Sequence, residues 1–191
     1  RISFTGCRFV NVEGAITHPG TTPLTNTVVT DLVMRDCHFT GTKAPVLLRG
    51  HANDAPHEAG IVLENLVIEK SFLASDTAIE LKNFRGVRIE NCRISDCREP
   101  VKLDGCADVV VGGCDLRQFT GVGVSSLNSN DVRIQNNTIR TGPSATSGAN
   151  AASHSHGIFL SESLNSVVTG NNIEGYTSTA GIGFAKVTHG I

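Results

Sequence analysis

A short phrase of apolar and polar residues returns along the whole chain and limits the folds that this sequence can adopt. Two apolar residues, separated by one residue, are followed three positions later by Cys, Asn or Ser. Another apolar residue comes two positions after that, as in Ile2, Phe4, Cys7 and Phe9. The anchor positions of this phrase are Cys7, Cys37, Ser71, Cys92, Cys114, Asn137 and Asn171. A second apolar pair follows roughly nine residues later, at Ile16/His18, Val46/Leu48, Ile79/Leu81, Val101/Leu103, Val122/Val124, Ile158/Leu160 and Ile182/Phe184. A period of two is typical of strands with one buried face, and no segment shows a competing helical period.

Short strands that return roughly every 22 residues cannot bury their apolar faces alone, whereas stacked repeats share one continuous core. The phrases, of which HGIFLSESLNSVVTGNNIEG (156–175) is an example, resemble the right-handed parallel β-helix of the pectin-lyase-like superfamily. This resemblance implies an all-β fold over residues 1–191, a single-stranded right-handed parallel β-helix of about seven rungs. Because the chain opens with RISF, already in this pattern, we expect it to be a fragment of a longer chain.

Charge and hydropathy narrow the classes of partner. The 191 residues carry a net charge of −2 with a pI of about 6.4. A nucleic-acid-binding protein would show a clustered basic surface, so we expect no nucleic-acid partner. No run of about 18 apolar residues is present, and we therefore expect no membrane partner.

The cysteines and histidines decide what the sequence predicts about disulfides and metals. We expect the anchor cysteines to be buried free thiols. Cys92 and Cys114 come near disulfide distance, but the bond needs a specific geometry; a Cys97–Cys106 disulfide is an open alternative. The sequence has no C-x2-C pair, so we predict no zinc site and no cofactor, with calcium left open. A metal site from His154 and His156, which share a face of an extended segment, is the second alternative.

The outward positions of the second strand set carry the charged residues of the middle rungs. In the register above, Val122 and Val124 point inward and Gly123 and Ser125 outward. One interpretation is a ladder of cross-strand ion pairs, Glu80 with Lys102 and Lys82 with Asp104. The other is a groove for an acidic polysaccharide, in which basic groups bind uronate carboxylates and ease proton removal beside them. The two interpretations are compatible.

Three insertions interrupt the regular spacing and carry most of the histidines. They span residues 19–31, 50–60 and 141–157, and loops of this kind on a rigid scaffold often hold functional sites. We expect the first two at one edge of the groove and the third at the other. Polar surface loops without a function are the alternative.

The segment DAPHE (54–58) resembles the D-P-H-E segment of alginate C5-epimerases, whose Asp and His belong to the catalytic site. The resemblance carries over to Asp54 and His57, with Ala55 inserted between the Asp and the Pro. That family also uses a Tyr and a second His. Tyr176 lies far along the rod. The segment SHGIF (155–159) would supply a second His, but on rung six, so this part of the pattern is not matched.

Two functions fit these residues. The first is an enzyme that acts on an acidic polysaccharide by lyase or epimerase chemistry. Its predicted catalytic residues are His57, Lys82 and Lys102, and its predicted substrate-binding residues are Arg49, Asp54, Glu80, Asp104 and Phe159, the last as a stacking platform for a sugar. The second is a non-catalytic, glycan-binding or structural shaft of a tail spike, adhesin or surface protein. Both imply an extracellular location or one on a cell or virion surface.

The ends of the rod lead to an expectation about assembly. The first and last rungs of a β-helix expose strand edges and apolar side chains, which favour association unless they are covered. The sequence stays in the repeat pattern at both ends. We therefore expect a homo-oligomer or end-to-end association.

Overall fold

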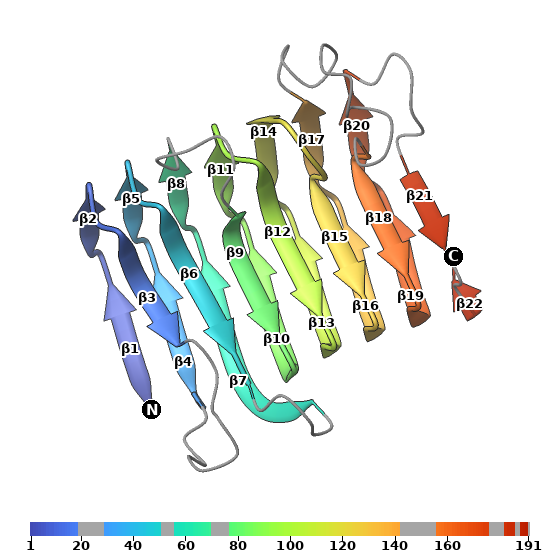
Figure 1. The fold of residues 1–191 in the computed structure, drawn as a ribbon, viewed down its shortest axis with the longest axis horizontal. Coiled ribbons are helices and arrows are strands. Elements are labelled where there is room, and N and C mark those ends of the chain that lie inside the picture. The colour runs from blue at the N-terminus through green and yellow to red at the C-terminus, as the bar shows by residue number, and fades with distance from the viewer. Residues whose placement is uncertain are drawn as a thin grey trace.

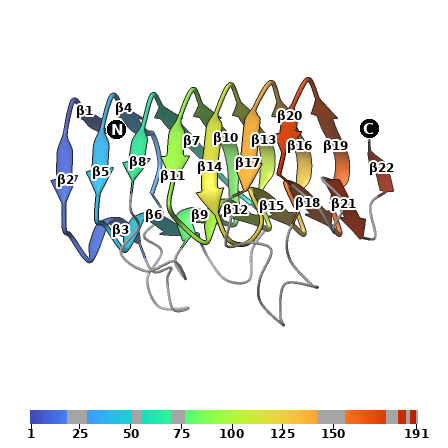
Figure 2. The same cartoon turned by 90° about the horizontal axis from the view of Figure 1, so that it is seen from above.

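The computed structural model describes residues 1–18, 29–50, 56–69, 77–141, 156–175, 182–185 and 188–190. These residues form a coil of short strands in three parallel sheets of eight, seven and seven strands. The rungs follow one another in chain order along the rod (Figure 1), and Figure 2 shows the three sheets as the three sides of the coil. The predicted all-β parallel helix of about seven rungs is confirmed. No helix of the described residues is long and apolar enough to cross a membrane.

Each rung contributes one strand to each sheet. The first sheet consists of β1 (Ile2–Thr5), β4 (Leu32–Arg35), β7 (His57–Glu64), β10 (Phe84–Glu90), β13 (Ala107–Gly112), β16 (Asn130–Gln135), β19 (Leu164–Thr169) and β22 (Thr188–Gly190). The second sheet consists of β2 (Arg8–Val10), β5 (His38–Thr40), β8 (Val67–Glu69), β11 (Arg93–Ser95), β14 (Asp115–Phe119), β17 (Thr138–Thr141) and β20 (Asn172–Glu174). The third sheet consists of β3 (Gly14–His18), β6 (Ala44–Arg49), β9 (Thr77–Lys82), β12 (Glu99–Asp104), β15 (Val124–Leu127), β18 (Ile158–Ser161) and β21 (Ile182–Ala185).

The register of the third sheet agrees with the predicted one on most rungs. Ile16 pairs with Val46, Val46 with Ile79, and Ile79 with Val101. The prediction for rung five is wrong by two residues, because Val124 and Ser126, not Val122 and Val124, lie opposite Val101 and Leu103. Consequently Ser125 and Leu127, not Gly123 and Ser125, lie across from the outward Lys102 and Asp104.

The anchor of rung three also differs from the prediction. Leu66, not Ser71, continues the column between Cys37 and Cys92: Val67 N donates to Cys37 O at 3.0 Å, and Arg93 N donates to Leu66 O at 2.8 Å. The inward pair before this anchor is therefore Ile61 and Leu63, both buried. Ser71 itself lies outside the described residues.

One left-handed residue precedes each anchor and makes the bend between the first and the second sheet. These residues have φ between 53° and 64° and are Gly6, Asp36, Asn65, Asn91, Gly113, Asn136 and Gly170. Gly, Asn and Asp tolerate this conformation better than other residues, whose Cβ clashes with the backbone. The high content of these residues is thus a consequence of bending the chain in every rung.

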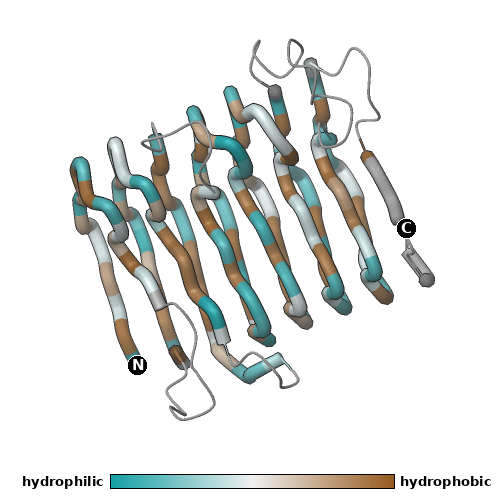
Figure 3. Tube along the Cα trace, viewed as in Figure 1, coloured by the Kyte–Doolittle hydropathy of each residue, from teal (hydrophilic) through white to brown (hydrophobic). Residues whose placement is uncertain are grey.

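The core is a continuous column of aliphatic side chains flanked by small residues. The eight residues that the register predicts as most buried are Val101, Leu103, Val122, Val124, Ile89, Ile94, Val111 and Leu116, and all are at most 3% exposed. Figure 3 shows the resulting alternation of hydrophobic and hydrophilic positions along the strands. Where asparagine replaces cysteine at the anchor, it bonds the backbone of neighbouring rungs: Cys114 N donates to Asn137 Oδ1 at 2.9 Å, and Asn137 Nδ2 donates to Val111 O at 3.0 Å.

All six cysteines are free, so the expected thiols are confirmed and a Cys97–Cys106 disulfide is absent. Cys106 belongs to a second inward column, which the sequence analysis missed. There Cys106 N donates to Ser129 Oγ at 3.1 Å, and the Cys106 thiol donates to Leu81 O at 3.4 Å. Small polar side chains at this corner satisfy the bent backbone, as asparagine does at the other.

Candidate functional site

The outer face of the third sheet presents two parallel rows of outward residues. The middle row consists of Thr17, Leu47, Glu80, Lys102, Ser125 and Phe159. The far row consists of Arg49, Lys82, Asp104, Leu127 and Ser161. Neighbouring members of a row are about 4.8 Å apart, the distance between adjacent strands. The predicted binding residues other than Asp54 and His57 therefore share one continuous surface.

Two ion pairs lie on this surface. Lys82 Nζ is 2.9 Å from Asp104 Oδ2, as the ladder prediction requires. Glu80 does not pair with Lys102 as predicted; its Oε1 accepts from Arg49 Nη2 at 2.9 Å. Arg49 lies directly across from Lys82, so its longer guanidinium side chain reaches diagonally to the carboxylate in the middle row.

The environment of Asp104 shows how these pairs act on charge. Burial favours the neutral carboxyl, but hydrogen bonds from Lys82 and Asn128, together with the positive charges of Lys82 and Lys102, outweigh it and lower the pKa of Asp104. Asn128 Nδ2 donates to Asp104 Oδ1 at 3.2 Å. Asp104 is thus an ionised partner for Lys82, and the two charges largely compensate each other.

Comparable ion pairs occur on the other two sheets. On the first sheet Arg35 Nε is 2.7 Å from Glu64, and on the second Arg93 Nη2 is 3.0 Å from Glu69 and Arg140 Nε is 3.0 Å from Glu174. Pairing across rungs is therefore a general feature of the rod surface. Exposed pairs of this kind contribute at most about 1 kcal/mol each, and they do not by themselves mark a site.

Lys102 differs from its two basic neighbours on this sheet. It is half-buried, lies between Glu80 and Ser125 in the middle row, and makes no ion pair within the described part of the chain. Ser125 beside it is only 5% exposed, and its Oγ has no hydrogen-bond partner among the described residues. The ammonium group of Lys102 is therefore placed to bind an anionic ligand, although its charge also acts on Asp104, whereas Arg49 and Lys82 are held in ion pairs.

Phe159 lies two rungs beyond Lys102 and is half-buried in the same row. Its ring centroid is 5.4 Å from that of His156, with the rings tilted by 40°. His156 lies two residues before the start of β18, and its ring packs beside that of Phe159. The sequence analysis considered it as a metal ligand and as the second His of the epimerase pattern, not as a partner of Phe159; the spacing of three residues between His156 and Phe159 was the available signal.

His57 occupies a corner rather than the outer face. It begins β7, lies across from Phe84, and its N donates to Asn83 O at 3.1 Å. This places its backbone across from the residue two positions beyond Lys82. Its Nε2 atom is shielded from solvent. Asp54, His51 and His154 lie outside the described residues, so the segment 54–58 is described only from Pro56 onward.

Metal ligands are not assembled in the described part of the chain. No group of three or more His, Cys, Asp or Glu residues there is placed to hold a metal ion. The charged residues in the two outward rows of the third sheet are instead two acid–base pairs and Lys102. Of the three insertions expected to border the groove, 19–31 and 141–157 lie largely outside the described residues, as do residues 51–55 of the insertion 50–60, whose residues 57–60 begin β7.

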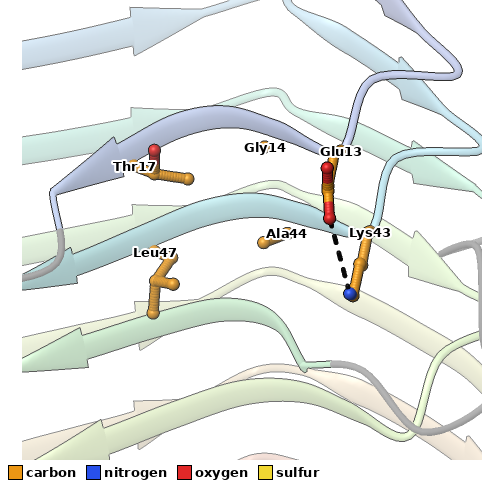
Figure 4. Close-up of a pocket in the computed structure, with 6 residues that line it drawn as sticks. All are labelled: Glu13, Gly14, Thr17, Lys43, Ala44 and Leu47. Atoms are coloured by element: carbon orange, nitrogen blue, oxygen red, sulfur yellow. Dashed lines mark ion pairs between the residues drawn. The ribbon is translucent and has the colours of Figure 1, made fainter.

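A hollow of about 480 Å³ opens on the same sheet at rungs one and two, and the sequence analysis did not predict it. It is lined by Glu13, Gly14, Thr17, Lys43, Ala44 and Leu47 (Figure 4). The Lys43 ammonium is 3.7 Å from Glu13 Oε1 at one side, and Thr17 and Leu47 stand at the other. The space between them remains open because positions 14 and 44, which pair across the strands, have at most a methyl group as a side chain.

Comparison with known proteins supports the fold. The family model described as "Right handed beta helix region" matches residues 25–184. No curated protein and no solved structure matches the chain. The similarity to alginate C5-epimerases at residues 54–58 is not shown by these comparisons.

Proposed function

The chain belongs to the right-handed β-helix family, and on that premise we propose that it binds an acidic polysaccharide along the outer face of the third sheet. Folds of this family are often carbohydrate-active, but one fold hosts many functions, so the argument depends on the surface itself. Seven strands in register form an elongated face, which matches an extended chain better than a compact ligand. Since such polysaccharides occur outside cells and on their surfaces, we also propose an extracellular, cell-surface or virion-surface location.

The observation that carries the proposal is the position of Lys102 at the centre of this face, without an ion-pair partner among the described residues. A uronate carboxylate placed over the middle row would accept a hydrogen bond from its ammonium group. Charge-assisted hydrogen bonds contribute about 1.5–3 kcal/mol. The partly covered surroundings of Lys102, with Ser125 almost fully buried beside it, reduce the screening of this interaction by water.

Phe159 supports the same placement of the ligand. It lies two rungs, or about 10 Å, from Lys102 in the same row. Its ring is held by contact with His156 and is partly exposed, as a platform for the apolar face of a sugar requires. A chain that lies along the middle row would contact both the cation and the ring.

Lyase or epimerase chemistry is the second candidate. Lys102 would then stabilise the charge that develops on the uronate when the neighbouring proton is removed. A base must come within hydrogen-bond reach of that proton. Binding without chemistry is favoured, because the Nε2 atom of His57 is shielded from solvent and its strand begins at the corner of the coil.

Calorimetric titration of the chain with oligogalacturonate, oligoalginate and chondroitin oligosaccharides tests the proposal. We expect Lys102→Ala to weaken binding of the preferred acid about tenfold or more. Arg133→Ala is the matched control, since Arg133 is exposed on the first sheet and makes no ion pair among the described residues. Equal affinity of wild type and Lys102→Ala would contradict the proposal. Formation of ultraviolet-absorbing unsaturated uronates during incubation would instead establish the lyase.

A further inference from the structure

We propose that the hollow on rungs one and two is a subsite for an uncharged pyranose unit, so that the ligand combines uronate and neutral sugars. This inference rests on the proposed function, because the hollow lies on the same face as Lys102. It concerns the residues that line the hollow, Glu13, Gly14, Thr17, Lys43, Ala44 and Leu47, none of which contributes to the argument from Lys102 and Phe159.

The size and the floor of the hollow suit a sugar ring. Its volume of about 480 Å³ falls within the range of about 300–1,000 Å³ that is usual for small-ligand sites. Ala44, Leu47 and the methyl group of Thr17 supply aliphatic surface, on which the C–H face of a pyranose packs. Gly14 leaves the Thr17 methyl group in place, because a Cβ added at position 14 would come within 2.7 Å of Thr17 Cγ2 and displace it.

The charges around the hollow favour an uncharged ligand. Glu13 and Lys43 form an ion pair at 3.7 Å, with the Glu13 side chain 89% exposed. A uronate placed here would meet the Glu13 carboxylate, while the Lys43 charge is already compensated. A neutral sugar hydroxyl both donates and accepts, so adjacent hydroxyls can donate to Glu13 and accept from Lys43.

The residues that line the hollow belong to the first two rungs. The two ends of the face therefore differ, and a bound chain would have a defined orientation on it. Ala44 stands two residues before the inward Val46. The corresponding residues of rungs three and four, which pair with each other, are the larger Thr77 and Glu99. The neutral subsite and Lys102 are about two to three rungs apart, or on the order of 10–14 Å. One extended oligosaccharide reaches both.

Methyl NMR of the isotope-labelled chain tests the subsite directly. On titration with methyl glucopyranoside, galactopyranoside or mannopyranoside, we expect at least one of them to shift the Ala44 and Leu47 methyl resonances saturably. Ala44→Leu should fill the hollow and abolish the shift at Leu47. Ser161→Leu, an outward substitution at the other end of the same sheet, is the control and should leave the shift unchanged. Absence of any shift, or a shift that persists in Ala44→Leu, would overturn the inference.

A second arm separates this inference from the proposed function. A homouronate oligosaccharide and one of equal length that alternates uronate with an uncharged hexosamine are titrated into both variants. Ala44→Leu should weaken binding of the alternating oligosaccharide about fivefold and leave the homouronate unchanged, whereas Lys102→Ala should weaken both. If Lys102→Ala weakens neither, the proposed function fails. If it weakens both but Ala44→Leu does not discriminate between them, only the neutral subsite fails.

Discussion

Replacing Ser126 by alanine is expected to stabilise this protein, although serine is the native residue. Ser126 is fully buried and faces the core between Leu103 and Leu160, with which it pairs across the strands. Its Oγ has no hydrogen-bond partner among the described residues. A buried hydroxyl without such a partner costs about 1–3 kcal/mol in proteins, and alanine removes it without adding volume.

The expected gain for Ser126→Ala is about 1–2 kcal/mol in the free energy of unfolding. For a chain of this length, 1 kcal/mol corresponds to about 2–4 °C in Tm. Urea unfolding followed by circular dichroism measures the difference, and Ser161→Ala, at a half-buried outward position on the next rung, is the matched control. A loss of stability in Ser126→Ala without a change in the control would refute the argument. It would show that the hydroxyl is bonded and that the register of rung five differs from the one described.

Three further predictions concern the core, the thiols and the ends of the rod. Leu103→Asp should unfold the protein, because it places an unpaired charge at a fully buried position; an unchanged thermal melt would contradict the register. Burial raises the pKa of Cys106 from 9.0 to about 11, so its thiol favours the folded state below pH 9 and stability should fall by up to about 3 kcal/mol between pH 9 and 11. Cys106→Ser, compared by urea titration across this range, should show a smaller decline. Ile2 and Val10 on the first rung are 49% and 45% exposed beside unpaired strand edges, so light scattering should detect concentration-dependent association, whereas a monomer at high concentration would contradict it.

The fold and most of the third sheet follow from local sequence signals. Alternation with a period of two determines which side chains point inward, and its return determines that rungs stack. For this reason the pairs Ile16–Val46 and Ile79–Val101 were predicted correctly. The sequence also indicates the positions of the bends, since Asn, Asp or Gly precedes each anchor where the backbone needs a positive φ.

Alternation within a strand does not determine how many residues the bend between two strands contains. Both errors of register, on rungs three and five, arose at such bends. Around rung three, Ile61/Leu63 and Leu66/Ile68 fit the apolar phrase equally well, as Val122/Val124 did on rung five. Contacts with neighbouring rungs decide between such pairs, because each strand must bond the backbone above and below it. Arg93 N donates to Leu66 O, and Val101 N donates to Gly123 O at 3.2 Å; neither contact is encoded in the local pattern.

The candidate site, too, depends partly on local sequence and partly on contacts between rungs. The sequence by itself placed Lys82, Lys102 and Asp104 on one outward face, because each is one residue from a buried aliphatic neighbour. Only the tertiary structure decided that Glu80 pairs with Arg49 and that Lys102 has no ion-pair partner among the described residues, since this depends on side-chain reach across rungs. It also created the hollow, which exists because Gly14 and Ala44, 30 residues apart in the chain, become neighbours when the coil closes.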